Sequence, residues 1–405
     1  MKFNQSDNEV KIIHSCEVCN GKSLQNLLNL KDQPMCDDLI PLTSNQKSKK
    51  FPLQIQFCKK CLTAHQAYQI KKEVLFPKQY HYRASLTQDV ILGMQELVES
   101  IENQYGSLDK KLVLDIGCND GSLLKIFNSK GARATGMEPT NAYKDANHPD
   151  IEILNNYFDS SSTDKYIDLF GQPDLITFTN VFAHIDDLKL VIGNLNKLCK
   201  ESTLIVIENH YLGSVLQYHQ FDTFYHEHPR TYSFKSFEYI AKKLNMHIVS
   251  CEFPKRYNGN IRVYLSKKTP INKIKIDESE FYFQMRKMQL SIDSRIEKIK
   301  QSLDELIKEH GPLYAKAFPG RASIIINYLN LNSSHIRATY EKSGSPKINN
   351  FIPGTDIPIM DEAELFEINP PIILNLAWHI HDEICNYINK FSPNSKVVRI
   401  WPNVE

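Results

Sequence analysis

Four cysteines near the N-terminus have the spacing of a metal site. Cys16 and Cys19 form one CxxC pair, and Cys58 and Cys61 form a second pair further along the chain. Thiolates carried on two tight turns can converge at about 2.3 Å from one zinc ion, so this spacing predicts tetrahedral zinc. A site closed by four cysteines leaves no open position for a substrate. We therefore expect this zinc to be structural.

Two alternatives to this zinc site remain open at the level of sequence. Cys36 and His65 are alternative ligands for the same ion, and a redox or fortuitous cysteine pair is the other interpretation. A zinc ribbon that binds nucleic acid is a functional rival. For such binding the segment offers only one short basic cluster, KSKK at 47–50. A solvent-exposed loop accounts equally well for this cluster.

A glycine-containing turn follows a buried strand in the segment LVLDIGCNDGSLL. Gly117 and Gly121 would let the backbone approach a ligand closely. Asn119 and Asp120 stand where a dinucleotide-binding GxGxxG fingerprint would continue, which disfavours a dehydrogenase. This turn favours a nucleoside cofactor of another kind, and an ordinary tight turn is the alternative.

Glu138 closes the next predicted strand, in the sequence GMEP. A carboxylate at that position can accept hydrogen bonds from both ribose hydroxyls of a bound nucleoside. The turn and Glu138 together predict S-adenosylmethionine as the cofactor, and hence a methyltransferase.

Histidines and aromatic residues gather after two later strands. His184 lies in TNVFAHIDDL, at the carboxyl end of the fourth predicted strand, where open α/β sheets bind their ligands. The segment FDTFYHEH places Tyr225, His226, Glu227 and His228 side by side. So dense a set of titratable groups predicts a catalytic role, with a second metal site as the rival interpretation.

Alternating short apolar runs and amphipathic segments surround these motifs. Strands are predicted at 111–116, 134–138, 151–155, 173–179, 202–208, 246–253 and 260–266, and one long helix at 281–310. The fold class is α/β: a central doubly wound, Rossmann-like domain, a small N-terminal zinc-binding domain with little regular structure, and a second, smaller α/β domain at the C-terminus, whose Rossmann-like architecture is implied by the family resemblance given below. The predicted boundaries are 1–80, 81–268 and 269–405.

Charge and hydropathy exclude two kinds of partner. With 48 Lys and Arg against 47 Asp and Glu, no electropositive field drives binding to nucleic acid or to a membrane surface. We find neither a secretory signal nor an apolar run long enough to span a membrane. We expect a cytoplasmic protein with a small-molecule substrate, as a monomer or small homo-oligomer.

The chain resembles, over nearly its whole length, the C-methyltransferases that act on nucleotide-activated deoxy-keto-sugars. The paired CxxC, IGCNDGSLL, GMEP, NVFAHIDDL, FDTFYHEH and FIPGTDIPI occur in that family's order. The resemblance implies the three domains given above and methylation of the carbon next to a sugar ketone, in polysaccharide or natural-product biosynthesis. Methylation of a hydroxyl group and a binding protein on a degenerate methyltransferase fold are the alternatives.

The resemblance also assigns residues. His228 would be the base, Tyr225 and His184 would stabilise an enolate, and Glu227 would orient the imidazole or the sugar. The resemblance matches Gly117, Asn119, Glu138 and Asn180 to cofactor contacts, and the full predicted cofactor set is Asp115, Gly117, Asn119, Asp120, Leu123, Glu138, Pro139, Asn180 and Ala183. The predicted substrate set is Asn258, Arg262 and Arg321, where Arg321 is either a partner for a diphosphate or an ordinary surface arginine. Here YNGNIR replaces the family's usual HGGSxR, and AFPGRAS departs from its glycine turn, so the acceptor or its nucleotide is expected to differ.

Overall fold

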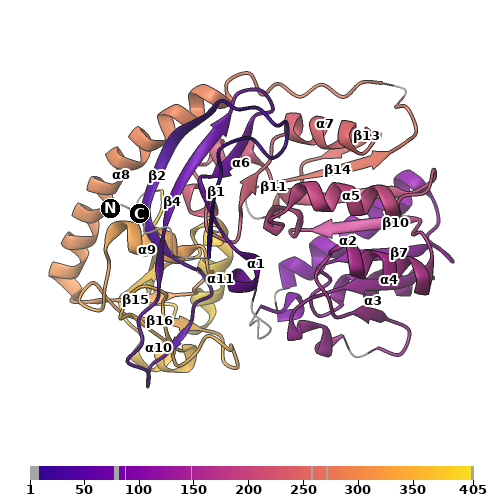
Figure 1. Ribbon diagram of the computed structural model, residues 1–405. Coiled ribbons are helices and arrows are strands. Elements are labelled where there is room, and N and C mark those ends of the chain that lie inside the picture. The colour runs from indigo at the N-terminus through magenta and orange to yellow at the C-terminus, as the bar shows by residue number, and fades with distance from the viewer. Residues whose placement is uncertain are drawn as a thin grey trace.

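The computed structural model describes residues 9–76, 82–86, 88–146, 148–256, 259–270 and 272–402. Figure 1 shows the central domain, the C-terminal domain and, between them, the long β-ribbon of the N-terminal domain. Asn258, one of the predicted substrate residues, lies outside the described part of the chain.

The central domain is built on a seven-stranded sheet in the order β13-β14-β11-β10-β7-β8-β9. Five strands are parallel and β14 runs antiparallel to both of its neighbours. The strands are β7 (Leu112–Ile116), β8 (Arg133–Met137), β9 (Glu152–Leu154), β10 (Leu175–Thr179), β11 (Leu204–His210), β13 (His247–Glu252) and β14 (Asn260–Ser266). All seven predicted strands are confirmed, and their parallel core brings the predicted cofactor and catalytic residues to one edge of the sheet.

Helices cover both faces of this sheet. One face packs against α2 and α3, and the other packs against α4, α5 and α7. The helices of this domain are α2 (Gln88–Tyr105), α3 (Ser122–Ser129), α4 (Ser160–Phe170), α5 (Leu188–Leu198), α6 (Leu212–Gln217) and α7 (Phe234–Lys243), and its short 3-10 turns are η1 (Ala84–Leu86), η2 (Asn141–Asp145), η3 (Phe182–His184) and η4 (Phe221–Thr223). Capping boxes at Asp159 and Ser233 fix where α4 and α7 begin.

The C-terminal domain has a second seven-stranded sheet, in the order β20-β19-β15-β16-β18-β17-β3. Its elements are α8 (Phe281–His310), β15 (Leu313–Lys316), α9 (Ala322–Leu329), β16 (Ile336–Glu341), β17 (Asn350–Phe351), β18 (Pro358–Asp361), α10 (Glu362–Ile368), β19 (Ile372–Asn375), η6 (Trp378–Ile380), α11 (His381–Phe391) and β20 (Lys396–Arg399). β15, β16, β18, β19 and β20 are parallel. The predicted long helix and the second α/β domain are confirmed.

The N-terminal domain contains more regular structure than the sequence indicated. Its elements are β1 (Val10–Ile12), β2 (Leu24–Pro34), β3 (Ile40–Pro41), β4 (Lys50–Cys58), β5 (Thr63–Gln66), β6 (Tyr68–Ile70) and α1 (Lys72–Leu75). β2 and β4 pair antiparallel over most of their length, interrupted by register shifts. The expectation of little regular structure was therefore wrong. The strands were hard to recognise in the sequence because these shifts and the left-handed Lys31 (φ 64°) interrupt the alternation of buried and exposed side chains.

Two of the sheets include a strand from another part of the chain. β12 (Arg230–Thr231), which follows the catalytic motif, adds to the sheet of the N-terminal domain by pairing with β5. β3, from the N-terminal domain, pairs with β17 at the edge of the C-terminal sheet. The N-terminal domain is thus hydrogen-bonded to both of the larger domains.

No helix among the described residues is both long enough and apolar enough to cross a membrane.

Candidate functional site

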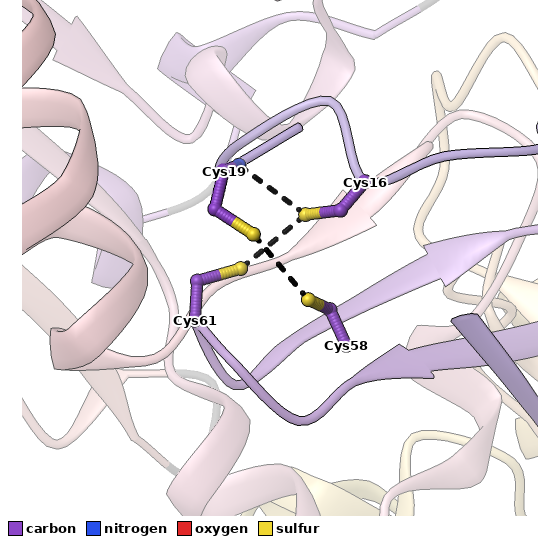
Figure 2. A group of neighbouring side chains, drawn as sticks. All are labelled: Cys16, Cys19, Cys58 and Cys61. Carbon is purple, nitrogen blue, oxygen red and sulfur yellow. Dashed lines mark hydrogen bonds between the residues drawn. The ribbon is translucent and has the colours of Figure 1, made fainter. Parts of the chain in front are cut away.

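The four predicted cysteines converge on one point. Their sulfur atoms all lie within 4.8 Å of one another, and the side chains point inward from two loops (Figure 2). Cys16 Sγ is 3.3 Å from Cys61 Sγ, and Cys19 Sγ is 3.5 Å from Cys58 Sγ. A tetrahedron with zinc–sulfur bonds of about 2.3 Å has edges of about 3.8 Å, so the arrangement fits zinc.

The alternative zinc ligands do not join this cluster. His65 Nε2 lies 3.3 Å from Cys16 Sγ, where it contacts a ligand without replacing one. Cys36 lies elsewhere: its N–H donates to Glu227 Oε1 at 3.1 Å, and its sulfur accepts from Ser323 Oγ at 3.3 Å. The alternative in which Cys36 is a ligand is therefore excluded, because the loop after β2 carries Cys36 toward Glu227 and Ser323.

The predicted cofactor turn joins β7 to α3 in a conformation that its residues favour. Gly117, Asn119 and Gly121 all have positive φ, at 72°, 50° and 71°. A Cβ on Gly117 would lie 2.6 Å from a methyl group of Val181, so only glycine fits there. The turn therefore exposes backbone at the carboxyl edge of the sheet, as a nucleoside cofactor requires.

Glu138 lies beside this turn at the end of β8. Its Oε2 accepts from the Asn119 N–H at 3.0 Å, and its Oε1 accepts from the N–H and hydroxyl of Thr140 at 2.9 and 2.6 Å. The carboxylate is only 5% exposed. These bonds fix the position of Glu138 next to the glycine turn. The remaining lone pairs of its carboxylate can accept hydrogen bonds from ribose hydroxyls.

A short segment from the start of the central domain crosses the same turn. Asn119 Oδ1 accepts from the N–H of Ala84 at 3.1 Å, and Asp120 Oδ2 accepts from the N–H of Ser85 at 2.8 Å. The hydrogen bonds to Ser122 and Ser85 lower the pKa of Asp120, against its burial. Asp120 thus holds the turn together from both sides.

The other predicted cofactor residues occupy the same edge of the sheet. Asp115 accepts a 2.6 Å bond from Thr177 Oγ1, and burial raises its pKa to about 7. Asn180 ends β10 with a left-handed φ of 56°. Ala183 donates its N–H to Asn209 Oδ1 at 3.3 Å. Leu123 is buried in the first turn of α3, and Pro139 follows Glu138.

Tyr225 and His228 form a hydrogen-bonded pair of side chains in the predicted catalytic set. Tyr225 Oη lies 2.9 Å from His228 Nε2, and His228 Nδ1 lies 3.0 Å from the carbonyl oxygen of Thr223. A carbonyl accepts only, so Nδ1 carries the proton and Nε2 keeps its lone pair. Burial lowers the pKa of His228 well below its usual value, so the ring is neutral and able to act as a base.

His184 packs against this pair, with its ring centroid 4.7 Å from that of His228. Its Nδ1 is 2.7 Å from the carbonyl oxygen of Glu227, and burial lowers its pKa to about 4. The neutral ring therefore holds its proton on Nδ1 and presents Nε2 as an acceptor. The enolate-stabilising role that the resemblance implies for His184 stays a prediction, and this tautomer would supply an acceptor rather than a donor at Nε2.

Glu227 is buried, and its Oε2 has no hydrogen-bond partner among the described residues. Burial and the nearby Asp37 raise its pKa to about 8. At neutral pH it is therefore a protonated acid that can donate to a ligand. His226, although it belongs to the same motif, faces the main chain of β2.

Two parts of the site were missed by sequence reasoning. His210, at the end of β11, has its ring centroid 5.7 Å from that of His228, and its position after a strand could have indicated it. Asp222 accepts from Trp378 Nε1 at 2.9 Å and from Arg321 at 2.6 and 2.8 Å. Because Trp378 lies in the C-terminal domain, only the tertiary structure reveals this contact.

The two described residues of the predicted substrate set are both engaged within the protein. Arg262 pairs with Glu208 and Glu252 at 2.7 Å each, and Arg321 pairs with Asp222. One nitrogen of each guanidinium, Nη2 of Arg262 and Nη1 of Arg321, has no hydrogen-bond partner among the described residues. Each arginine therefore keeps one buried donor.

The sheet order and the glycine turn with its acidic partner are those of a Rossmann-like, class I methyltransferase domain. Comparisons with known protein families agree. Residues 93–250 match a methyltransferase domain, residues 257–399 match a C-methyltransferase C-terminal domain, and residues 16–76 match a zinc binding domain. The chain is thus an S-adenosylmethionine-dependent methyltransferase with a structural zinc site, and its three matched regions together resemble the domain arrangement of a C-methyltransferase.

Among individual proteins, the chain is similar to the C-methyltransferase NovU of Streptomyces niveus. The two are 24% identical over 402 residues, which cover 95% of this chain and 94% of NovU.

The chain is also similar in part to several solved structures. Magnesium protoporphyrin IX methyltransferase of Synechocystis PCC 6803 is 16% identical, with 44% of this chain and 84% of that chain covered and a TM-score of 0.34. The PH0226 protein of Pyrococcus horikoshii OT3 is 14% identical, with 48% and 98% covered and a TM-score of 0.36.

The rival interpretation of the histidine cluster as a second metal site gains no support. Among the described residues, only the four cysteines bring three or more metal-binding atoms together.

Proposed function

We propose that this enzyme methylates the carbon next to the ketone of a nucleotide-linked 4-keto-deoxysugar. The observation that carries the proposal is the pairing of Tyr225 Oη with His228 Nε2 at 2.9 Å. A base and a hydroxyl donor this close can address neighbouring atoms of one substrate, the acidic hydrogen at C3 and the carbonyl oxygen at C4.

The proposed roles follow from the protonation states. His228 Nε2 takes the C3 proton, while the Tyr225 hydroxyl turns from His228 to the substrate oxygen and stabilises the enolate. Bound S-adenosylmethionine supplies an electrophilic methyl group for the nucleophilic carbon. Glu227, protonated and buried, donates to a sugar oxygen, and His184 Nε2 accepts from a sugar hydroxyl or from the imidazolium.

A nucleotide-linked substrate is supported by the C-terminal domain. There the N–H of Phe318, in the turn after β15, donates to Glu341 Oε1 at the end of β16. The same relation joins Asn119 and Glu138 at the cofactor turn, and Ala317, like Gly117, has a left-handed φ. A second turn of this type suits a second nucleoside, with the free Nη1 of Arg321 as a donor to its diphosphate.

The test is to incubate the zinc-loaded enzyme with S-adenosylmethionine and a panel of nucleotide-linked sugars, with and without a 4-keto group. Mass spectrometry should find one added methyl group, and only on the keto-sugars. That methyl group should survive treatment that cleaves methyl ethers, because it is bonded to carbon. Methyl transfer to the reduced sugars, with a cleavable methyl ether as product, would instead establish hydroxyl methylation.

A further inference from the structure

A single side chain of the zinc-binding domain holds both ends of the catalytic turn. Gln66, the last residue of β5, donates from Nε2 to the carbonyl oxygen of Tyr225 at 2.6 Å and to that of His228 at 2.9 Å. Its own N–H donates to the carbonyl oxygen of Pro229 at 2.9 Å. Gln66 is only 1% exposed, so water does not compete for these bonds.

The strand that carries Gln66 begins directly after the second cysteine pair. Cys61 Sγ lies 3.1 Å from Thr63 Oγ1, the first residue of β5, and His65 in the same strand contacts Cys16. β5 pairs with β12, which continues the chain from the catalytic turn. The zinc ion and the catalytic turn are therefore connected through one short, hydrogen-bonded strand.

A second contact joins the zinc domain to the segment after His184. The fully buried Arg230 pairs with Glu17, which lies between the first two cysteines, and also donates to the carbonyl oxygens of Ile185 and Asp186. Both loops that carry catalytic histidines thus have polar supports in the zinc domain.

We propose that Gln66 is a positioning residue for methyl transfer, through which the zinc domain holds the Tyr225–His228 turn in its reactive geometry. The inference rests on the proposed function insofar as it takes His228 as the base. The Oε1 atom of Gln66 has no hydrogen-bond partner among the described residues, so its carboxamide is directed at the turn alone. Without the two bonds, the carbonyl groups at both ends of the turn lose their shared donor, and the imidazole no longer keeps its position relative to Tyr225.

The test compares Gln66→Leu with Gln33→Leu in the full-length, zinc-loaded protein. Gln33 is also 1% exposed and lies in the same domain, but its side chain donates from Nε2 to the carbonyl oxygen of Leu30 within β2, and its substitution keeps the main-chain carbonyl that contacts His226. The measurements are zinc content, S-adenosylmethionine affinity by calorimetry, kcat and KM with a 4-keto-sugar, and histidine-labelled NMR spectra in which His228→Ala assigns the His228 signals.

We expect Gln66→Leu to lose about 10- to 100-fold in kcat, because small misplacements of catalytic groups have effects of this size. Zinc content, cofactor affinity and KM should change by less than about twofold, and the His228 signals should shift. Gln33→Leu should keep both kcat and those signals. If Gln66→Leu does not fold, Gln66→Glu, which keeps the size of the side chain, is measured in its place with the same expectations.

Two results would overturn the role of Gln66: unchanged kcat with unmoved His228 signals, or equal losses in both variants. Absence of turnover by the wild-type enzyme with every keto-sugar would contradict the proposed function instead. The NMR comparison does not need a substrate, so it still decides the role of Gln66 in that case.

Discussion

Tyr225 Oη donates to the lone pair of His228 Nε2 over 2.9 Å, and the opposite nitrogen of that ring is fixed by Thr223. The phenol therefore covers the atom that would remove a proton from carbon. A substrate with an acidic C–H beside a carbonyl can separate the pair, because its oxygen accepts from Tyr225 while its hydrogen approaches His228. This exchange of partners is the basis of the predictions below.

Replacing His228 should stop the chemistry but spare the cofactor site. For His228→Ala we predict a fall in kcat of about 10²- to 10⁴-fold, the usual contribution of a general base, with S-adenosylmethionine affinity unchanged by calorimetry. His219→Asn is the control, because His219 lies in the same domain and faces Ser291 on α8. Equal activity in His228→Ala and wild type would show that the histidine cluster is structural.

Glu227 should make the protein less stable as the pH rises. Its pKa is near 4.5 when exposed and is raised to about 8 by burial, so the stability it confers is complete below pH 4.5 and is lost as the pH rises through 8. Glu227→Gln cannot ionise and keeps an acceptor for the Cys36 N–H. We predict that it is more stable than wild type at pH 8 by on the order of 1–3 kcal/mol, with the difference shrinking toward pH 5.

Denaturant unfolding at several pH values measures this effect. A difference between Glu227→Gln and wild type that stays constant from pH 5 to pH 8 would contradict a protonated Glu227.

Loss of zinc should destabilise the N-terminal domain and, because Gln66 in β5 binds the Tyr225–His228 turn, should also lower activity. Wild-type protein should contain about one zinc ion per chain by metal analysis, and Cys58→Ser should bind less and melt at a lower temperature, since a structural metal contributes folding free energy. Cys199→Ser, which alters a buried cysteine outside the cluster, controls for the loss of a thiol. A zinc-free Cys58→Ser protein with wild-type melting and activity would refute a structural role.

Glu138 should determine cofactor affinity. Glu138→Gln keeps one acceptor but replaces the other with a donor that opposes the Asn119 N–H or a ribose hydroxyl. We predict S-adenosylmethionine binding at least about 10-fold weaker by calorimetry, with normal zinc content. Unchanged affinity would place the ribose elsewhere.

The sequence predicted the central domain closely because its signals are local. The strands of the parallel sheet are short apolar runs, and the glycines of the cofactor turn are required by its positive φ values. The order of TNVFAHIDDL and FDTFYHEH relative to those strands was enough to bring His184 and His228 to one edge. The placement of these two histidines at one edge follows from the topology of the sheet alone.

Other contacts were beyond local reasoning because they join distant parts of the chain. Nothing near Gln66 indicates that it binds the carbonyl groups of Tyr225 and His228, and the pairing of Asp222 with Arg321 and Trp378 depends on how the C-terminal domain packs. The protonation states likewise depend on burial. The tautomer inferred for His184 depends on a tertiary contact too, the bond of its ring to the main chain of Glu227.

Hydrogen exchange at the substrate carbon tests enolate chemistry most directly. The enzyme would be incubated in deuterium oxide with a nucleotide-linked 4-keto-sugar and S-adenosylhomocysteine, which cannot donate a methyl group. Proton NMR should show loss of the hydrogen at C3 with wild type and its retention with His228→Ala. Retention of that hydrogen with wild type, together with formation of a methyl ether when S-adenosylmethionine is supplied, would contradict methylation at carbon.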